Sequence, residues 1–148
     1  MKQTQWLMPV VLAGSLIFNA CTSADTHEAT ARLFLDQYLV ATDQEAAILL
    51  TTGRARADIQ EEIDLLANVE NRDQLIQESR PKAHFDKIYE KPRPNGDVAY
   101  LFRAEFSRQG MSLEPRDVFL LVTQVEGVYK IKSFSFRSPS DSHTSDKP

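Results

Sequence analysis

Hydrophobic and polar residues alternate in residues 98–107, which predicts a β-strand with one covered face. The more apolar phase of this segment consists of Val98, Tyr100, Phe102, Ala104 and Phe106. We expect that phase to pack against helices. Residues 117–122 are instead apolar on both phases, which is typical of a central strand that is covered on both sides.

Turn residues divide residues 84–137 into four extended segments. Asn95-Gly96 separates the first two, and Asn-Gly is a strong hairpin signal because both residues tolerate a positive φ. Glu126-Gly127 predicts a second hairpin, and the segment around Gly110 predicts a looser connection between the middle strands. The expected product is a four-stranded antiparallel meander.

The residues before the meander show the periodicity of helices. A first buried stripe consists of Ala31, Phe34, Leu35, Tyr38 and Leu39. Asp25 or Thr26 can cap this helix, Thr42-Asp43 can cap a second that ends at Gly53, and a third follows Asp58. The fold class predicted is therefore α+β, with N-terminal helices packed on a curved four-stranded antiparallel sheet.

The last strand leaves two arrangements open. Tyr129 and Ile131 occupy one phase, whereas Phe134 and Phe136 occupy the other. If the first pair faces the helices, Phe134 and Phe136 join Phe119 and Leu121 in an apolar patch on the outer sheet face. Such a patch would dock a second copy of the chain or another protein. A β-bulge in this strand would instead return both phenylalanines to the core.

An N-terminal leader is predicted in residues 1–20. Lys2 precedes an apolar run in residues 6–18 that is shorter than the roughly 20 residues needed to span a bilayer. The following Phe18-Asn19-Ala20-Cys21 resembles the bacterial lipobox, in which the cysteine is lipidated. Cys21 is also the only cysteine, so no disulfide can form within the chain.

Lipidation at Cys21 predicts the domain organisation and the location. Residues 21–24 would be a lipidated tether, residues 25–137 a single domain, and the polar residues 138–148 a disordered tail. Acyl chains on Cys21 would hold the domain in the cell envelope, on the periplasmic or outer face of a bacterial membrane. The net charge of −4 argues against a nucleic-acid partner.

Two parts of the chain also carry a family resemblance. Phe34-Leu35 and Tyr38-Leu39 on the first helix, together with the closing hairpin VEGVYKIKSF in residues 125–134, resemble the nuclear transport factor 2-like (cystatin-like) superfamily. That resemblance implies a cone-shaped α+β domain with a pocket between the first helix and the concave sheet. Members of the superfamily use the pocket for isomerase or dehydratase chemistry, for ligand binding, or not at all.

Enzymes of this superfamily place Asp, His or Tyr in the pocket, and the candidates here are Tyr38, His84, Asp86 and Tyr100. His84 and Asp86 share a strand phase, so they could face one cavity as a base and its partner. Alternatively, both lie on the solvent side of an edge strand, and the tyrosines are core aromatics. The three histidines are far apart in sequence and no phosphate-binding loop is present, so we expect neither a metal nor a cofactor.

The sequence thus favours a membrane-anchored, non-catalytic binding or accessory module that could serve as a subunit of an envelope complex. The alternative is a small-ligand-binding protein or an isomerase- or dehydratase-like enzyme that uses the cone pocket.

Overall fold

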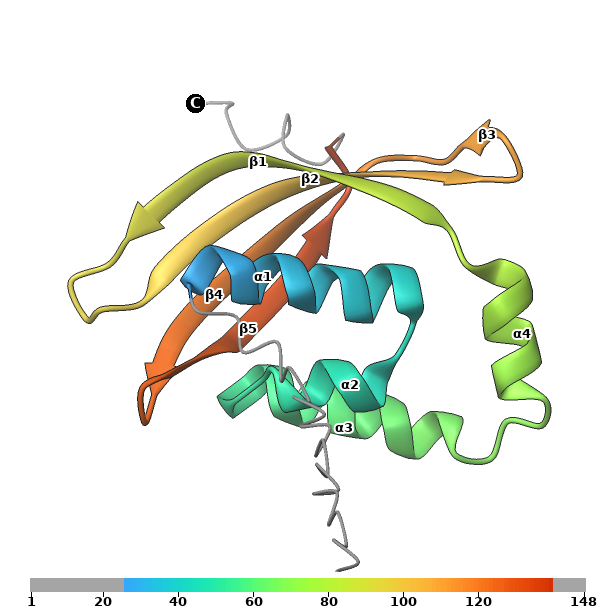
Figure 1. Ribbon diagram of the computed structural model, residues 1–148, viewed down its shortest axis with the longest axis horizontal. Coiled ribbons are helices and arrows are strands. Elements are labelled where there is room, and N and C mark those ends of the chain that lie inside the picture. Colours follow the sequence, from blue (N-terminus) through green and yellow to red (C-terminus); the bar gives the residue numbers. More distant parts are fainter. Residues whose placement is uncertain (1–25, 140–148) are drawn as a thin grey trace, which may run out of the picture.

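The computed structural model describes residues 26–139, which form an α+β fold (Figure 1). Its elements are α1 (His27–Leu35), the π-helix η1 (Asp36–Ala41), α2 (Gln44–Leu49), α3 (Gly53–Leu66), α4 (Arg72–Ser79), β1 (Lys82–Pro92), β2 (Val98–Arg108), β3 (Met111–Ser112), β4 (Arg116–Val125) and β5 (Val128–Arg137). The predicted leader, Cys21 and the tether lie outside the described residues, as do residues 140–148 of the predicted tail.

The antiparallel sheet has the strand order β1-β2-β4-β5, and the short β3 pairs with the end of β2. The four long strands match the predicted meander, but the prediction of four strands in total missed β3. The segment around Gly110 is a tight turn, since Gln109 and Gly110 both have positive φ, 50° and 80°. This geometry is typical of two-residue hairpin loops, and it brings Met111 opposite Arg108.

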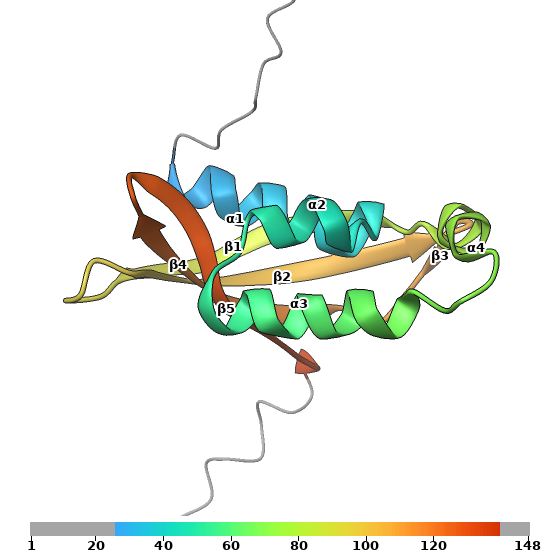
Figure 2. The same ribbon diagram turned by 90° about the horizontal axis from the view of Figure 1, so that it is seen from below.

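Helices α1, α2 and α3 cover one face of the sheet, which we call the inner face (Figures 1 and 2). The core lies between them and the phase of β2 that was predicted to be covered: Tyr100, Phe102 and Ala104 are fully buried. Thr26 caps α1, because its Oγ1 accepts a hydrogen bond of 3.1 Å from the Ala29 amide. Asp43 caps α2 in the same way through the Ala46 amide, at 2.9 Å.

Gly53 begins α3 rather than ending α2, so the predicted start of the third helix after Asp58 was too late. The reason is a contact with the sheet that local sequence does not reveal. The Ile131 amide donates to the Leu50 carbonyl at 2.8 Å, and the Thr52 amide donates to the Ile131 carbonyl at 2.9 Å. These two bonds fix an extended connection between α2 and α3, and Gly53 turns the chain out of it with a φ of +55°.

A β-bulge interrupts β5. Val122 pairs with Ile131 and Leu121 pairs with Ser133, so Lys132 has no partner in the ladder. An extra residue in one strand shifts the side-chain alternation by one position. Ile131 and Phe134 therefore share the inner face, although a regular strand would place them on opposite faces.

The outer-face placement of Phe134 and Phe136 is therefore wrong, and the bulge arrangement is the one that the structure shows. The centroid of the Phe134 ring lies 5.3 Å from that of Phe34 and 5.1 Å from that of Tyr38. Phe136 stacks on Tyr38 with a centroid distance of 6.0 Å. Both phenylalanines pack against the core beneath α1 and η1.

Candidate functional site

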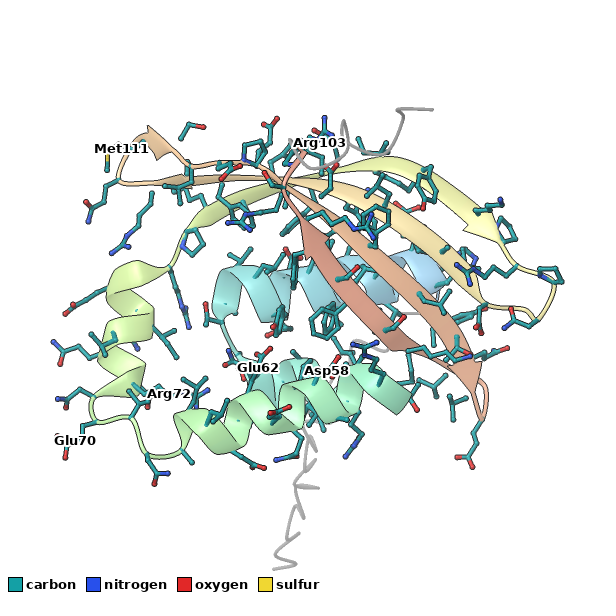
Figure 3. All side chains as sticks on the ribbon, turned by 180° about the vertical axis from the view of Figure 1, so that it is seen from behind. Asp58, Glu62, Glu70, Arg72, Arg103 and Met111 are labelled. Atoms are coloured by element: carbon teal, nitrogen blue, oxygen red, sulfur yellow. The ribbon has the colours of Figure 1, made fainter. Side chains whose placement is uncertain are left out.

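The hydroxyl of Tyr38, one of the predicted pocket residues, is already engaged. It donates a hydrogen bond of 2.6 Å to Oε1 of Glu62 on α3. Glu62 is labelled in Figure 3. Burial raises the pKa of Tyr38, and the hydrogen bond to Glu62 raises it further. Tyr38 therefore stays protonated at neutral pH, and its ring stacks on Phe34 at a centroid distance of 5.4 Å.

Tyr100, the second predicted pocket tyrosine, is fully buried on the inner face. Its hydroxyl forms a hydrogen bond with His27 Nδ1. Burial raises the pKa of Tyr100, and the nearby carboxylate of Glu90 raises it further. His27 also lies 3.9 Å from Glu90 Oε1. His27, Tyr100 and Glu90 thus form a cluster that joins the start of α1 to β1 and β2.

Sequence reasoning missed this cluster, because His27 was considered only as a metal ligand. His27 and Tyr100 are 73 positions apart. The available signal was that His27 lies in the first turn of a helix expected to pack on the phase of β2 that contains Tyr100. The direction in which that helix crosses the sheet is needed to bring the two side chains together, and periodicity does not supply it.

His84 and Asp86 lie outside the helix-covered face, so they do not share a pocket with the tyrosines. In the register of β1 and β2, His84 is opposite Glu105 and Asp86 is opposite Arg103. His84 Nε2 lies 3.1 Å from Asp86 Oδ1, and the two side chains are 73% and 56% exposed. The proposed base and its partner are therefore a solvent-facing pair on an edge strand, which was the alternative interpretation.

The outer face of the sheet is not covered by any helix in residues 26–139, and it contains a groove. The volume of this outer groove is about 320 Å³. The side chains that form it come from all four long strands: Tyr89, Ala99, Phe119, Leu121, Ser133 and Ser135. The alanine and the two serines are small, so they leave a hollow beside the two aromatic rings. Although β4 is central in strand order, it is covered by helices on one side only.

Charged side chains border the outer groove at both ends. Arg54 and Arg93 line one end. Beyond the other end, Arg103 donates to both carboxylate oxygens of Asp117, at 2.9 and 3.2 Å. Asp117 is only 8% exposed, so this ion pair is held in a fixed geometry. Arg103 is labelled in Figure 3, on the side of the sheet away from the helices.

Arg137 adds a cation to the same end, since its guanidinium lies 5.3 Å from the centroid of the Phe119 ring. The outer groove therefore combines an apolar centre at Phe119 and Leu121 with guanidinium groups at its rim. This composition suits the docking of a protein surface, because apolar and aromatic centres with arginine are enriched at such interfaces.

The described part of the chain shows neither a metal centre nor a membrane span. Within residues 26–139, no group of three or more His, Cys, Asp or Glu side chains is arranged to hold a metal ion. None of the helices described in that range is long and apolar enough to cross a membrane.

Comparisons with known proteins support the fold. No family model matches the chain, and no curated protein matches it. Among solved structures, the chain is similar to Aln2 from a Streptomyces species, with a TM-score of 0.51 and 13% sequence identity. The similarity covers 78% of this chain and 92% of Aln2. At this identity the likeness concerns the fold alone, and it is consistent with the α+β arrangement described above.

Proposed function

We propose that the chain is a lipid-anchored, non-catalytic accessory module that docks a protein partner in a bacterial envelope complex. The outer groove is the observation on which the proposal rests. It places Phe119 and Leu121 in the centre of a sheet face that the helices leave uncovered. An exposed apolar centre surrounded by a charged rim is typical of surfaces that bind another protein.

Acylation of Cys21 explains how the groove would meet its partner. Each buried methylene of an acyl chain contributes about 0.8 kcal/mol, so two or more chains give stable anchoring. The four residues between Cys21 and Thr26 reach at most about 14 Å when extended. The domain would therefore stay close to the lipid headgroups and to proteins embedded among them.

The inner face supports a role without catalysis. The resemblance to the nuclear transport factor 2-like superfamily suggests a cone whose pocket would lie on this face. Here the hydroxyls of Tyr38 and Tyr100 are both hydrogen-bonded to other side chains, and the rings of Phe34 and Phe134 pack against Tyr38. These aromatic contacts contribute to stability and occupy space that a ligand would need.

One observation favours a second candidate function. His27, Tyr100 and Glu90 bring an imidazole, a phenol and a carboxylate together at one end of the inner face. Such a set could hold a small ligand or move a proton in an isomerase- or dehydratase-like reaction. In that case the protein would retain a small molecule rather than a protein partner.

Extraction of the native protein from membranes in mild detergent separates the two functions. Filling the outer groove with Ser135→Trp leaves the packed inner face unchanged, so we expect the fold to survive and the co-purifying partner to be lost. Leu49→Trp is the matched control, since Leu49 is 64% exposed on α2, on the helix side. A monomer that contains a bound small molecule, or a partner retained by the Ser135→Trp variant, would contradict the docking proposal.

A further inference from the structure

The start of α1 lies at the same end of the molecule as two turns of the sheet. Nδ1 of His27 lies 3.9 Å from Oε1 of Glu90 near the end of β1, and the centroids of the His27 and Tyr129 rings are 5.6 Å apart. The β1–β2 turn (residues 93–97) and the β4–β5 turn (residues 126–127), with the residues beside them, form what we call the hairpin end. Figures 1 and 2 show it opposite α4.

The two hairpins of this end are fastened to each other. Asp97 in the β1–β2 turn is 4% exposed, and its Oδ2 accepts hydrogen bonds from Lys132 on β5 at 3.0 Å and from Asn95 at 2.9 Å. The Arg93 amide donates to the Asp97 carbonyl at 2.8 Å, which closes the turn. These bonds hold the two turns in fixed relative positions.

The hairpin end presents cations together with exposed apolar side chains. Lys91 and Arg93 are exposed at the β1–β2 turn. Val125 and Val128, which pair beside the β4–β5 turn, are 40% and 51% exposed, and Glu126 is the acidic residue of that turn. Cations next to a small apolar tip suit an anionic lipid surface, because headgroup phosphates attract Lys and Arg while apolar side chains enter the interface.

The charge of the rest of the molecule favours the same orientation. Residues 27–79, which form the helices, contain eleven acidic and four basic side chains, whereas residues 80–137 contain seven acidic and eleven basic ones. Glu70 is labelled in Figure 3 and lies at the end opposite the hairpin turns. An anionic surface would therefore repel the helices and attract the hairpin end.

We propose that the hairpin end lies on the bilayer and binds anionic lipid headgroups through Lys91 and Arg93. Val125 and Val128 enter the interface between headgroups and acyl chains. This contact sets the orientation of the domain, because the strands then rise from the bilayer. The outer groove faces sideways as a result, toward proteins embedded in the same membrane.

The membrane contact rests on the acylation of Cys21, which is part of the proposed function. The tether ends at Thr26, directly before α1, so acyl chains on Cys21 would draw the hairpin end, rather than α4, toward the lipid. Docking of a protein in the outer groove is a separate claim, since vesicles without any partner protein are sufficient to test the membrane contact.

Fluorescence of the full acylated chain in vesicles provides that test. An NBD dye is attached to Val128→Cys or to Met111→Cys, the matched control, which is 62% exposed at the opposite end and labelled in Figure 3. The vesicles consist of phosphatidylcholine alone or of equal parts of phosphatidylcholine and phosphatidylglycerol. With the anionic lipid, emission from position 128 should shift to shorter wavelength, and emission from position 111 should stay the same. Equal emission from position 128 in both kinds of vesicle would overturn the proposal.

Two double variants that carry the dye at position 128 assign the contact to its cations. Lys91→Gln/Arg93→Gln should lower the ratio of bound to free hairpin end about 25-fold, because each basic residue near an anionic surface contributes a factor of about five. Lys82→Gln/Arg108→Gln is the matched control, since it removes two exposed cations from the other end of β1 and β2. It should leave the ratio unchanged, and equal ratios for the two double variants would contradict the proposal.

Failure of the acylation itself gives a different result. Cys21 is the only cysteine of the chain, so the parent protein takes up no dye when this thiol is acylated. Dye uptake by the parent would overturn the proposed anchor and the membrane contact with it. A parent that takes up no dye, with no lipid-dependent shift at position 128, would overturn the membrane contact alone.

Discussion

The two faces of the sheet use their aromatic residues in different ways. On the inner face, the rings of Phe34, Tyr38 and Phe134 contact one another beneath α1 and η1. On the outer face, Tyr89 and Phe119 stand beside alanine and serine, and a groove remains between them. The same four strands thus provide a packed face and a hollowed face, and we propose that the hollowed face serves recognition. The proposed docking surface would therefore lie on the opposite face from the pocket that the family resemblance implies.

The largest expected effect comes from a deletion that exchanges the two faces of β5. Removal of both Lys132 and Ser133 places Phe134 opposite Leu121, so Phe134 and Phe136 move to the outer face. Both rings are partly buried against the core, so moving the two of them into solvent should cost about 3–5 kcal/mol in total. A domain is stable by only about 5–15 kcal/mol, so this variant should be strongly destabilised. Far-UV circular dichroism at 25 °C measures the outcome.

Deletion of Lys132 alone is the control for the double deletion. It removes the bulge and restores a regular alternation in which Phe134 still faces the helices. Both variants lose the 3.0 Å ion pair of Lys132 with Asp97, so that loss cancels in the comparison. The single deletion should remain folded. If the double-deletion variant melts at the same temperature as the control, the bulge does not decide which face holds the phenylalanines.

A matched pair of truncations gives the next largest difference. Phe34→Ala removes a fully buried ring and should lower the free energy of unfolding by about 3–5 kcal/mol. Phe119→Ala removes a partly exposed ring from the outer groove and should cost about 1–2 kcal/mol. Urea denaturation measures both values. Equal losses would mean that the outer face is part of the core.

The inner tyrosines predict how stability depends on alkaline pH. Burial raises the pKa of Tyr38 and of Tyr100 in the folded state. The two tyrosines therefore contribute fully to the free energy of unfolding below the ordinary tyrosine pKa of about 10. This contribution is lost as the pH rises above that value. Tyr38→Phe should lower stability by about 1 kcal/mol at pH 7 and should weaken the decline above pH 10. The measurement is the denaturation midpoint of the parent and of Tyr38→Phe across this pH range. If stability declines as steeply in the variant as in the parent, the result counts against the burial of Tyr38.

The smallest effect is expected at the exposed pair on β1. His84→Ala and Asp86→Ala remove side chains that contact mainly solvent and each other. Exposed ion pairs of this kind contribute little to stability, so thermal unfolding should match the parent. A clear loss of stability, or of any bound ligand, would make these residues functional candidates again.

Local patterns were sufficient to predict much of the inner layer. The covered phase of β2, the cap at Asp43 and the hairpin at Asn95-Gly96 follow from side-chain alternation and turn chemistry, and the structure shows all three. Thr26 was one of two residues proposed to cap α1, and it is the one whose cap is described.

Features that depend on contacts between distant segments were not predictable in this way. A bulge in β5 was one of the two arrangements left open for Phe134 and Phe136, and nothing in the alternation decides between them or marks Lys132 as its position. The sheet contact of Ile131 moves the start of α3 to Gly53. Of the four predicted interface residues, Phe119 and Leu121 line the outer groove. Phe134 also borders it, but the rings of Phe134 and Phe136 pack against the core. The pairing of His27 with Tyr100 was not foreseen.

The central claim is that the outer groove docks a protein, and photo-crosslinking in intact cells tests it most directly. A benzoylphenylalanine in place of Phe119 lies in the groove, and one in place of Leu49 lies on the helix side. We predict one crosslinked product of defined mass from position 119, absent when Ser135→Trp fills the groove, and none from position 49. The same product from position 49, with none from position 119, would contradict the account.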